Sequence, residues 1–181
     1  MRRTVFSALM IAAPLLSQPA TEPAATPIDS PPSVQEAILN APVAEVWKVW
    51  STSAGYKHLG VAQADVDLRI GGLIRSHYSA KGALGDEETI ENRILAFEPQ
   101  RMIAFRIERP PKSFPFKEAW KTTWTVVTFT DLGDGRTKVR GATMGYGNDE
   151  ESATMRKFFD AGNASTLKVL QNYFDSLTAK K

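Results

Sequence analysis

The chain has 181 residues, with 22 Lys and Arg, 20 Asp and Glu, and no cysteine. The lack of cysteine excludes disulfides, a lipoprotein anchor and any zinc site built on thiolates. Two of the basic residues, Arg2 and Arg3, belong to a predicted targeting segment, which is described in the next paragraph. Without them, the chain has 20 basic and 20 acidic residues. A neutral domain has no bulk attraction for phosphate, so nucleic acid is not an expected partner.

Residues 1–20 have the pattern of a secretory signal peptide. Arg2 and Arg3 precede an apolar, uncharged run at 4–16, and small residues follow it. This run is too short to cross a bilayer as a resident helix, so we expect no stable membrane span after cleavage. The segment therefore predicts a periplasmic or secreted protein. A disordered apolar tail or an uncleaved anchor is the alternative.

Residues 21–33 have the Pro- and Ala-rich composition of a linker, because such a segment buries too little apolar surface to offset its ordering entropy. The remaining stretch, 34–179, has the length of one domain and contains no internal repeat. Its first strand is expected at 34–39. Pro42 then suits the first turn of a helix at 43–51.

Several strand-like segments follow a turn or second short helix at 53–59. Their alternation of polar and apolar residues predicts strands at 65–70, 73–79, 89–97, 102–108, 120–130 and 137–146. Gly71-Gly72 marks a hairpin between the first two of these strands. Three prolines make 109–118 a long loop or a ragged sheet edge.

The last long stretch, 149–177, reads as a single helix of about eight turns. Asn148 or Asp149 can cap its start. Spacings of three and four positions place six residues on one face: Phe159, Asn163, Leu167, Leu170, Phe174 and Leu177. A buried amide without a partner costs roughly 1–3 kcal/mol. Asn163 is therefore expected to contact the backbone, hold a water molecule or face a cavity.

Together these elements predict an α+β fold, in which a curved antiparallel sheet wraps around a long C-terminal helix and two short helices follow the first strand. Three segments carry a family pattern: residues 41–47 (APVAEVW), residues 67–75 (DLRIGGLIR) and residues 133–139 (GDGRTKV). Because these segments occur in this order and the closing helix follows them, the chain resembles the helix-grip fold of the START/Bet v 1 superfamily (SRPBCC). Within it, the chain is similar to the branch named after the C-terminal domain of the activator of Hsp90 ATPase.

The resemblance covers 34–177 and implies the fold, but not one function, because the superfamily includes lipid carriers, hormone receptors and cyclases. Two features depart from the family pattern. Family members are mostly cytoplasmic, whereas this chain has a predicted signal peptide, so Hsp90 is not an expected partner. The family often has Gly-Trp where this chain has Gly162-Asn163. An amide in place of an indole would enlarge the pocket or make its wall more polar.

The resemblance implies a pocket between the concave face of the sheet and the long helix. Alternation along four strands gives the residues expected to face it: Ile74, Ser76 and Tyr78; Ile90, Asn92 and Ile94; Phe105 and Ile107; Trp124 and Val126. A slip of one residue would invert any of these faces. The predicted ligand-binding residues are Tyr56, Ile74, Ser76, Tyr78, Asn92, Phe105, Trp124, Phe159 and Asn163. Aromatic and aliphatic walls with a few polar groups are typical of a small-ligand site, and a filled core is the alternative.

No catalytic, metal or cofactor signature accompanies this pattern. The two histidines, His58 and His77, are far apart, and the chain lacks a nucleophile elbow, a Walker loop and a dinucleotide fingerprint. We therefore predict a domain without metal, cofactor or catalytic residues that binds a small hydrophobic or amphipathic ligand. Two alternatives stay open. One is a cyclase-, dehydratase- or isomerase-like enzyme whose pocket His or Tyr polarises a carbonyl, and the other is an envelope protein-interaction module with a packed interior.

Overall fold

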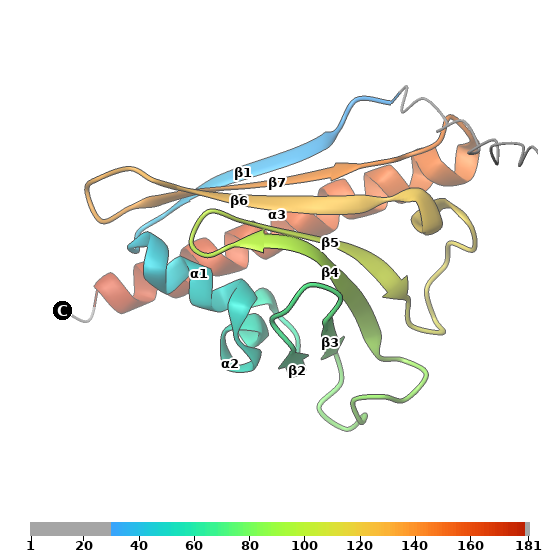
Figure 1. The fold of residues 1–181 in the computed structure, drawn as a ribbon, viewed down its shortest axis with the longest axis horizontal. Helices are drawn as coiled ribbons and strands as arrows, with labels where there is room; N and C mark the ends of the chain where they lie inside the picture. The colour runs from blue at the N-terminus through green and yellow to red at the C-terminus, as the bar shows by residue number, and fades with distance from the viewer. Residues whose placement is uncertain (1–29, 180–181) are drawn as a thin grey trace, which may run out of the picture.

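A seven-stranded antiparallel sheet and one long helix dominate residues 30–179, the part of the chain that this computed structural model describes (Figure 1). The strands are β1 (Ser33–Leu39), β2 (Gln63–Val66), β3 (Leu73–His77), β4 (Ile90–Glu98), β5 (Met102–Arg109), β6 (Trp124–Asp131) and β7 (Thr137–Met144). The helices are α1 (Val43–Ser51), α2 (Ser53–Tyr56) and α3 (Glu150–Thr178), with 3-10 turns η1 (Lys57–Leu59) and η2 (Ala119–Thr122). The predicted signal peptide at 1–20 and most of the predicted linker at 21–33 lie outside the described residues, so both stay predictions.

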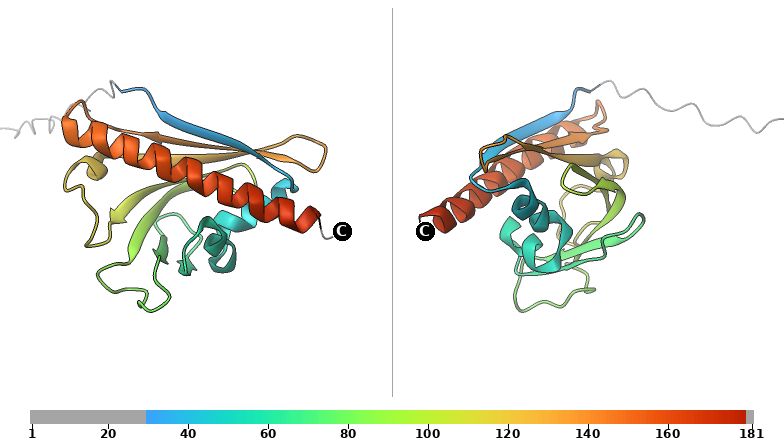
Figure 2. Two further views of the ribbon diagram at one scale, coloured as in Figure 1. Left: turned by 180° about the vertical axis from the view of Figure 1, so that it is seen from behind. Right: turned by 60° about the vertical axis from the view of Figure 1, so that its left-hand side comes forward.

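The strands follow the order β1-β7-β6-β5-β4-β3-β2, and every neighbouring pair is antiparallel. The first strand is therefore paired with the last one at one edge, and β2 forms the other edge. The β4–β5 pairing shifts register between Glu91 and Asn92 and again between Ile94 and Ala96, and such irregularities bend a strand. Figure 2 shows α3 running along the inner side of the bent sheet, which confirms the predicted α+β helix-grip fold.

The two short helices follow β1, as predicted. Pro42 stands immediately before α1, where its fixed φ and missing N–H are tolerated. The apolar residues of α1 are buried: Val46, Trp47, Val49 and Trp50. Trp47 and Trp50 meet Phe129 of β6 edge-on, with ring centroids 5.6 and 5.1 Å apart. These aromatic contacts attach α1 to one end of the sheet.

Helix α3 begins at a side-chain cap and presents a buried stripe. One carboxylate oxygen of Asp149, Oδ1, accepts a hydrogen bond from the Ser152 backbone N–H at 2.9 Å, and Oδ2 accepts from the Ser152 hydroxyl at 2.7 Å. This satisfies a backbone donor that a helix start leaves unpaired. The predicted stripe is largely confirmed, but it ends at Phe174, because Leu177 is 42% exposed.

Two packed clusters hold α3 against the rest of the domain. The larger cluster joins α1 and the inner face of the sheet to the C-terminal half of α3, where Leu170 and Phe174 are buried. The smaller cluster surrounds Met155, near the helix start, with Phe116 and Tyr146. The middle of α3 lies between the two clusters, and this segment faces the cavity described below.

Candidate functional site

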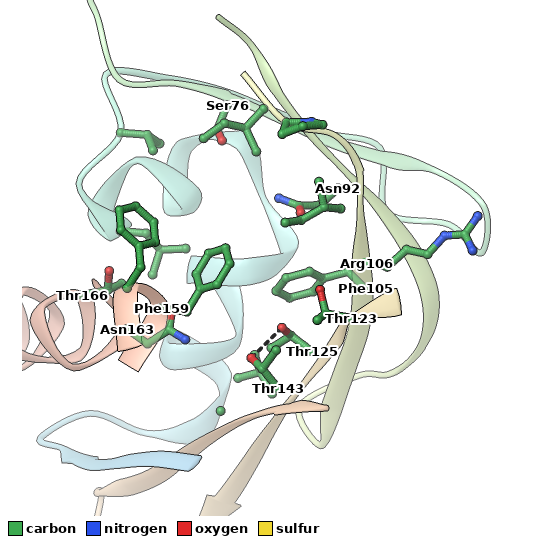
Figure 3. A pocket seen from close by; sticks show the side chains of 18 of the residues that line it. Ser76, Asn92, Phe105, Arg106, Thr123, Thr125, Thr143, Phe159, Asn163 and Thr166 are labelled. Atoms are coloured by element: carbon green, nitrogen blue, oxygen red, sulfur yellow. Dashed lines mark hydrogen bonds between the residues drawn. The ribbon is translucent and has the colours of Figure 1, made fainter. Parts of the chain in front are cut away.

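A cavity of about 510 Å³ lies between the concave face of the sheet and the middle of α3 (Figure 3). Its walls come from α1, α2, η1, five of the strands (β3 to β7), Gln35 of β1, the Pro-rich segment 110–115 and α3. Pockets for small molecules have volumes of roughly 300–1,000 Å³, so this space can hold one small ligand. Its lining is mostly aliphatic and aromatic, with hydroxyl and amide groups at defined positions.

Most of the residues predicted to bind ligand surround this cavity. Those that line it are Tyr56, Ser76, Tyr78, Asn92, Phe105, Trp124, Phe159 and Asn163. They come from α2, β3 and the residue after it, β4, β5, β6 and α3, so the fold brings together positions spread over most of the domain. Their contact with a ligand stays a prediction.

Ile74 does not belong to the lining, contrary to the sequence-based placement. It shares a face of β3 with Ser76, but it is completely buried in the larger cluster together with Val49 and Ile94. The cavity ends at Ser76 because the side chains of α1 and the neighbouring strands cover the rest of that face. Strand alternation gives a residue's face, but not the depth to which a cavity extends along it.

The predicted cavity face of β6 is wrong at Val126. Thr125 and Val127 point to the cavity, and Val126 does not line it. Trp124 reaches the cavity from the first position of the strand. Phe129 explains the reversal, because it lies on the same face as Thr125 and Val127 and is buried beneath α1. The Thr-Val-Val-Thr run alone has no clear alternation, so the sequence did not determine this face.

Gly141 of β7 contributes open space that the sequence analysis missed. It lies between Val139 and Thr143 on the cavity face, and its cross-strand neighbours Gln35 and Val127 also line the cavity. A Cβ atom added at Gly141 would meet no described atom within 4 Å. The missing side chain therefore leaves part of the cavity floor empty. A glycine inside a strand is a known sign of a close approach and could have pointed to this position.

At one end of the cavity, the polar side chains pair with one another. The hydroxyls of Thr125 and Thr143 are 2.9 Å apart, as the dashed line in Figure 3 shows. Nearby, Asn163 Nδ2 donates to Gln35 Oε1 at 3.5 Å, and Gln35 Nε2 donates to Asp160 Oδ1 at 2.8 Å. Asp160 also accepts from the Ser33 hydroxyl. This network links β1 to α3 and gives the Asn163 Nδ2 group one partner.

The other end of the cavity carries polar groups with few partners. Ser76 and Asn92 lie at this end in Figure 3, away from Thr125 and Thr143. Among the described residues, the Asn92 side chain has one hydrogen-bond partner, the Tyr56 hydroxyl, and the Ser76 hydroxyl has none. Burial raises the pKa of the Tyr56 hydroxyl above its usual range, Tyr78 adds to this shift, and the hydrogen bond with Asn92 opposes it. Tyr56 is therefore neutral at neutral pH.

Exposed aromatic side chains border the cavity where it meets solvent. Tyr78 is 71% exposed and Phe158 is 51% exposed, yet both belong to the lining. Phe114, from the Pro-rich segment, packs against both Phe158 and Phe159, with ring centroids 6.2 and 6.0 Å away. These contacts place an aromatic rim at the mouth of the cavity.

Residues 40–175 match the model of the family described as activator of Hsp90 ATPase homolog 1-like protein. The chain belongs to this family. Among solved structures, MLL2253 from Mesorhizobium loti is similar, with 14% identity, a TM-score of 0.61, and coverage of 79% of this chain and 96% of that one. The Aha1 dimer from Colwellia psychrerythraea is similar at 12% identity and a TM-score of 0.54, covering 76% of this chain and 94% of that one.

The di-domain ARO/CYC BexL, from the BE-7585A biosynthetic pathway, gives 17% identity and a TM-score of 0.63. That match covers 84% of this chain and 48% of BexL. At such identities the likeness shows the fold alone. No curated protein matches the chain. The family assignment and the fold thus agree with each other, and the function has to be argued from the cavity.

The cavity of this family member has a neutral lining. Arg106 is the one charged residue among the described lining residues, and in Figure 3 its side chain points away from the cavity centre. Neither histidine lines the cavity. His58 stacks on Tyr173 of α3 with ring centroids 3.9 Å apart, and His77 Nδ1 accepts a hydrogen bond from the Ser79 backbone N–H at 2.9 Å. Both imidazoles therefore have structural contacts away from the cavity.

Within residues 30–179, the carboxylates and imidazoles form no cluster of three that could hold a metal ion. None of the helices in this part of the chain combines the length and the apolar character needed to cross a bilayer.

Proposed function

We propose that this domain binds one small hydrophobic or amphipathic molecule in the cavity between the sheet and α3, without catalysing a reaction. The observation that carries this proposal is the unfilled volume of about 510 Å³ beneath the middle of α3. Packed clusters lie on both sides of it, around Leu170 and around Met155. Since interiors are normally filled to crystal-like density, a space of this size with an apolar lining supports a binding role.

The lining favours binding over acid–base catalysis. General acids and bases work best when their pKa lies near the operating pH. The ionisable side chains among the described lining residues are Tyr56, Tyr78 and Arg106. Burial moves the pKa of Tyr56 further from neutrality, and Arg106 lies outside the cavity centre. A cyclase- or isomerase-like reaction at this site would have to rely on these groups.

We also propose that the protein acts outside the cytoplasm, in the periplasm or after secretion, and that Hsp90 is not its partner. This proposal rests on the sequence of residues 1–20. Fractionation of cells that express a C-terminally tagged chain tests it. Export predicts tagged protein in the envelope or medium, shortened by the length of the signal peptide. Full-length protein confined to the cytoplasm would contradict export.

Two measurements test ligand binding. Native mass spectrometry of protein purified from its own host should show a fraction carrying one small molecule, which is lost after denaturation. The neutral dye Nile red should bind the ligand-stripped protein saturably, with one dye per chain. Absence of both the adduct and saturable dye binding would overturn the proposal. If a pull-down then returned one specific protein, the interaction-module alternative would replace it.

An enzyme at the same site would give a different result. If Tyr56→Phe protein co-purifies with a molecule that differs from the wild-type adduct by a defined chemical step, the cavity performs a reaction. If both proteins carry the same molecule, the binding proposal stands.

A further inference from the structure

We infer that the ligand carries an uncharged hydrogen-bonding group, a hydroxyl or a carbonyl, seated at Tyr56, Ser76 and Asn92, and that the cavity discriminates against a carboxylate or phosphate there. This inference rests on the proposed function and specifies its ligand class. It depends on a contrast between the two polar ends of the cavity.

At the end near α3 and β7, four polar side chains already bond within the protein. Thr125 and Thr143 bond to each other, and Asn163 bonds to Gln35. Gln35 is held in turn by Asp160. A ligand group placed there would compete with bonds that the protein already makes. This end therefore contributes to the shape of the site more than to recognition of a polar group.

The end formed by β3 and β4 has unused hydrogen-bonding capacity. Ser76 is 2% exposed and Asn92 is 8% exposed, and both line the cavity. Buried polar side chains are nearly always hydrogen-bonded, because leaving them unpaired is unfavourable. Among the described residues, the Tyr56 hydroxyl is the one side-chain hydrogen-bond partner of Asn92. A hydroxyl or carbonyl on the ligand would supply the missing partners.

Charge decides which kind of group fits. No described cation points into this end of the cavity. Arg75 of β3 and Arg93 of β4 alternate with the cavity-facing residues, so they lie on the face of the sheet away from the cavity. Each forms an ion pair there: Arg75 with Glu91 at 3.6 Å, and Arg93 with Glu108 at 2.9 Å. A carboxylate brought here would lose its hydration without gaining a counter-charge, whereas a neutral group would lose much less.

The space between the two ends suits an apolar body. Phe105 and Phe159 lie there in Figure 3, between Ser76 and Asn92 on one side and Thr125 and Thr143 on the other. An aromatic ring or short hydrocarbon in this position would pack against both phenyl rings. The expected ligand is therefore apolar in its body with one neutral polar group.

Displacement of Nile red by three matched probes at neutral pH tests this inference: naphthalene, 2-naphthol and 2-naphthoate. The three probes share one ring system. Naphthalene has no polar group, 2-naphthol has a neutral hydroxyl, and 2-naphthoate has a carboxylate. We expect 2-naphthol to displace the dye at about fivefold lower concentration than naphthalene for each hydrogen bond gained. We expect 2-naphthoate to be the weakest of the three.

A double variant, Ser76→Ala with Asn92→Leu, tests the residues. It should abolish the preference for 2-naphthol over naphthalene. The control Asn172→Leu makes the same amide-to-leucine change on the exposed side of α3 and should keep the preference. Thermal unfolding, monitored by circular dichroism, checks that each variant folds. If the double variant does not fold, Tyr56→Phe alone gives a milder test.

The outcomes separate this inference from the proposed function. If Nile red does not bind and native mass spectrometry finds no adduct, the proposed function fails. If Nile red binds but none of the probes displaces it, the inferred ligand class is overturned. If all three displace it equally, or 2-naphthoate does so best, the cavity binds ligands but the inference is overturned. A preference for 2-naphthol that persists in the folded double variant would overturn the assignment to Ser76 and Asn92.

Discussion

Replacing Gly141 by valine should close part of the cavity without weakening the fold. Gly141 lies on the cavity face of β7, which is paired with β1 and β6. A Cβ atom added there would have no described atom within 4 Å. Its φ is not positive, so an ordinary residue fits the backbone. Valine is also a favourable strand residue. The substitution therefore changes the ligand space more than the protein packing.

Both effects can be given a size. A glycine inside a strand destabilises the fold by roughly 0.5–1 kcal/mol relative to alanine, so Gly141→Val should raise the free energy of unfolding by about that amount. Valine adds three carbon atoms to the cavity. If three carbon groups of the ligand then stay unburied, at about 0.8 kcal/mol each, the binding free energy weakens by about 2.4 kcal/mol. This corresponds to a roughly fiftyfold higher Kd.

The assay combines urea unfolding with a Nile red titration on the same samples. Gly162→Ala is the matched control, because it also removes a glycine next to open space, but on the exposed side of α3. The control should gain stability and keep the affinity of the wild type. If Gly141→Val folds and binds Nile red as tightly as the wild type, the space above Gly141 is not where the dye binds, and the reasoning is refuted.

Three further predictions concern α3 and the residues beside it. Asn163→Trp should fill the cavity wall near Gln35 and weaken Nile red binding roughly tenfold, about 1.4 kcal/mol; unchanged affinity in a folded variant would show that Asn163 does not border the bound dye. Asp149→Ala should remove the cap on Ser152 and lower the free energy of unfolding by about 1 kcal/mol in urea, and no loss would mean that the cap is not formed in solution. Burial, followed by the nearby charge of Asp160, raises the pKa of Tyr146 to about 12. Because an unfolded tyrosine titrates near pH 10, the stability linked to this shift is present below about pH 10 and is lost as the pH rises toward 12. Tyr146→Phe should therefore lose less stability than the wild type over that range, and equal losses in urea unfolding would contradict the shift.

The fold could be predicted because its signals are local and consistent. Pro42 before an apolar helix, alternation in β3 to β5 and the stripe of α3 each agree with the helix-grip architecture. On β3, β4 and β5 the alternation also gave the correct cavity face, since Ser76, Asn92 and Phe105 all line the cavity.

The depth of the cavity and its polar pairing could not be predicted, because they depend on how distant elements pack. Ile74 shares the face of Ser76 but is covered by the core, and nothing in the sequence of β3 separates the two residues. Gln35 and Asp160 are 125 positions apart and meet only when α3 crosses the sheet beside β1. At Gly141 the relevant feature is a missing side chain, and residue patterns describe empty space poorly.

Nuclear Overhauser contacts between bound 2-naphthol and the protein test the central claim most directly, because they locate the ligand without relying on affinity. A ligand inside the cavity predicts contacts from the naphthyl protons to the rings of Phe105 and Phe159 and to the Thr125 methyl group. Contacts confined to the exposed rings of Tyr78 and Phe158, with none to the interior residues, would place the ligand on the surface and contradict the account.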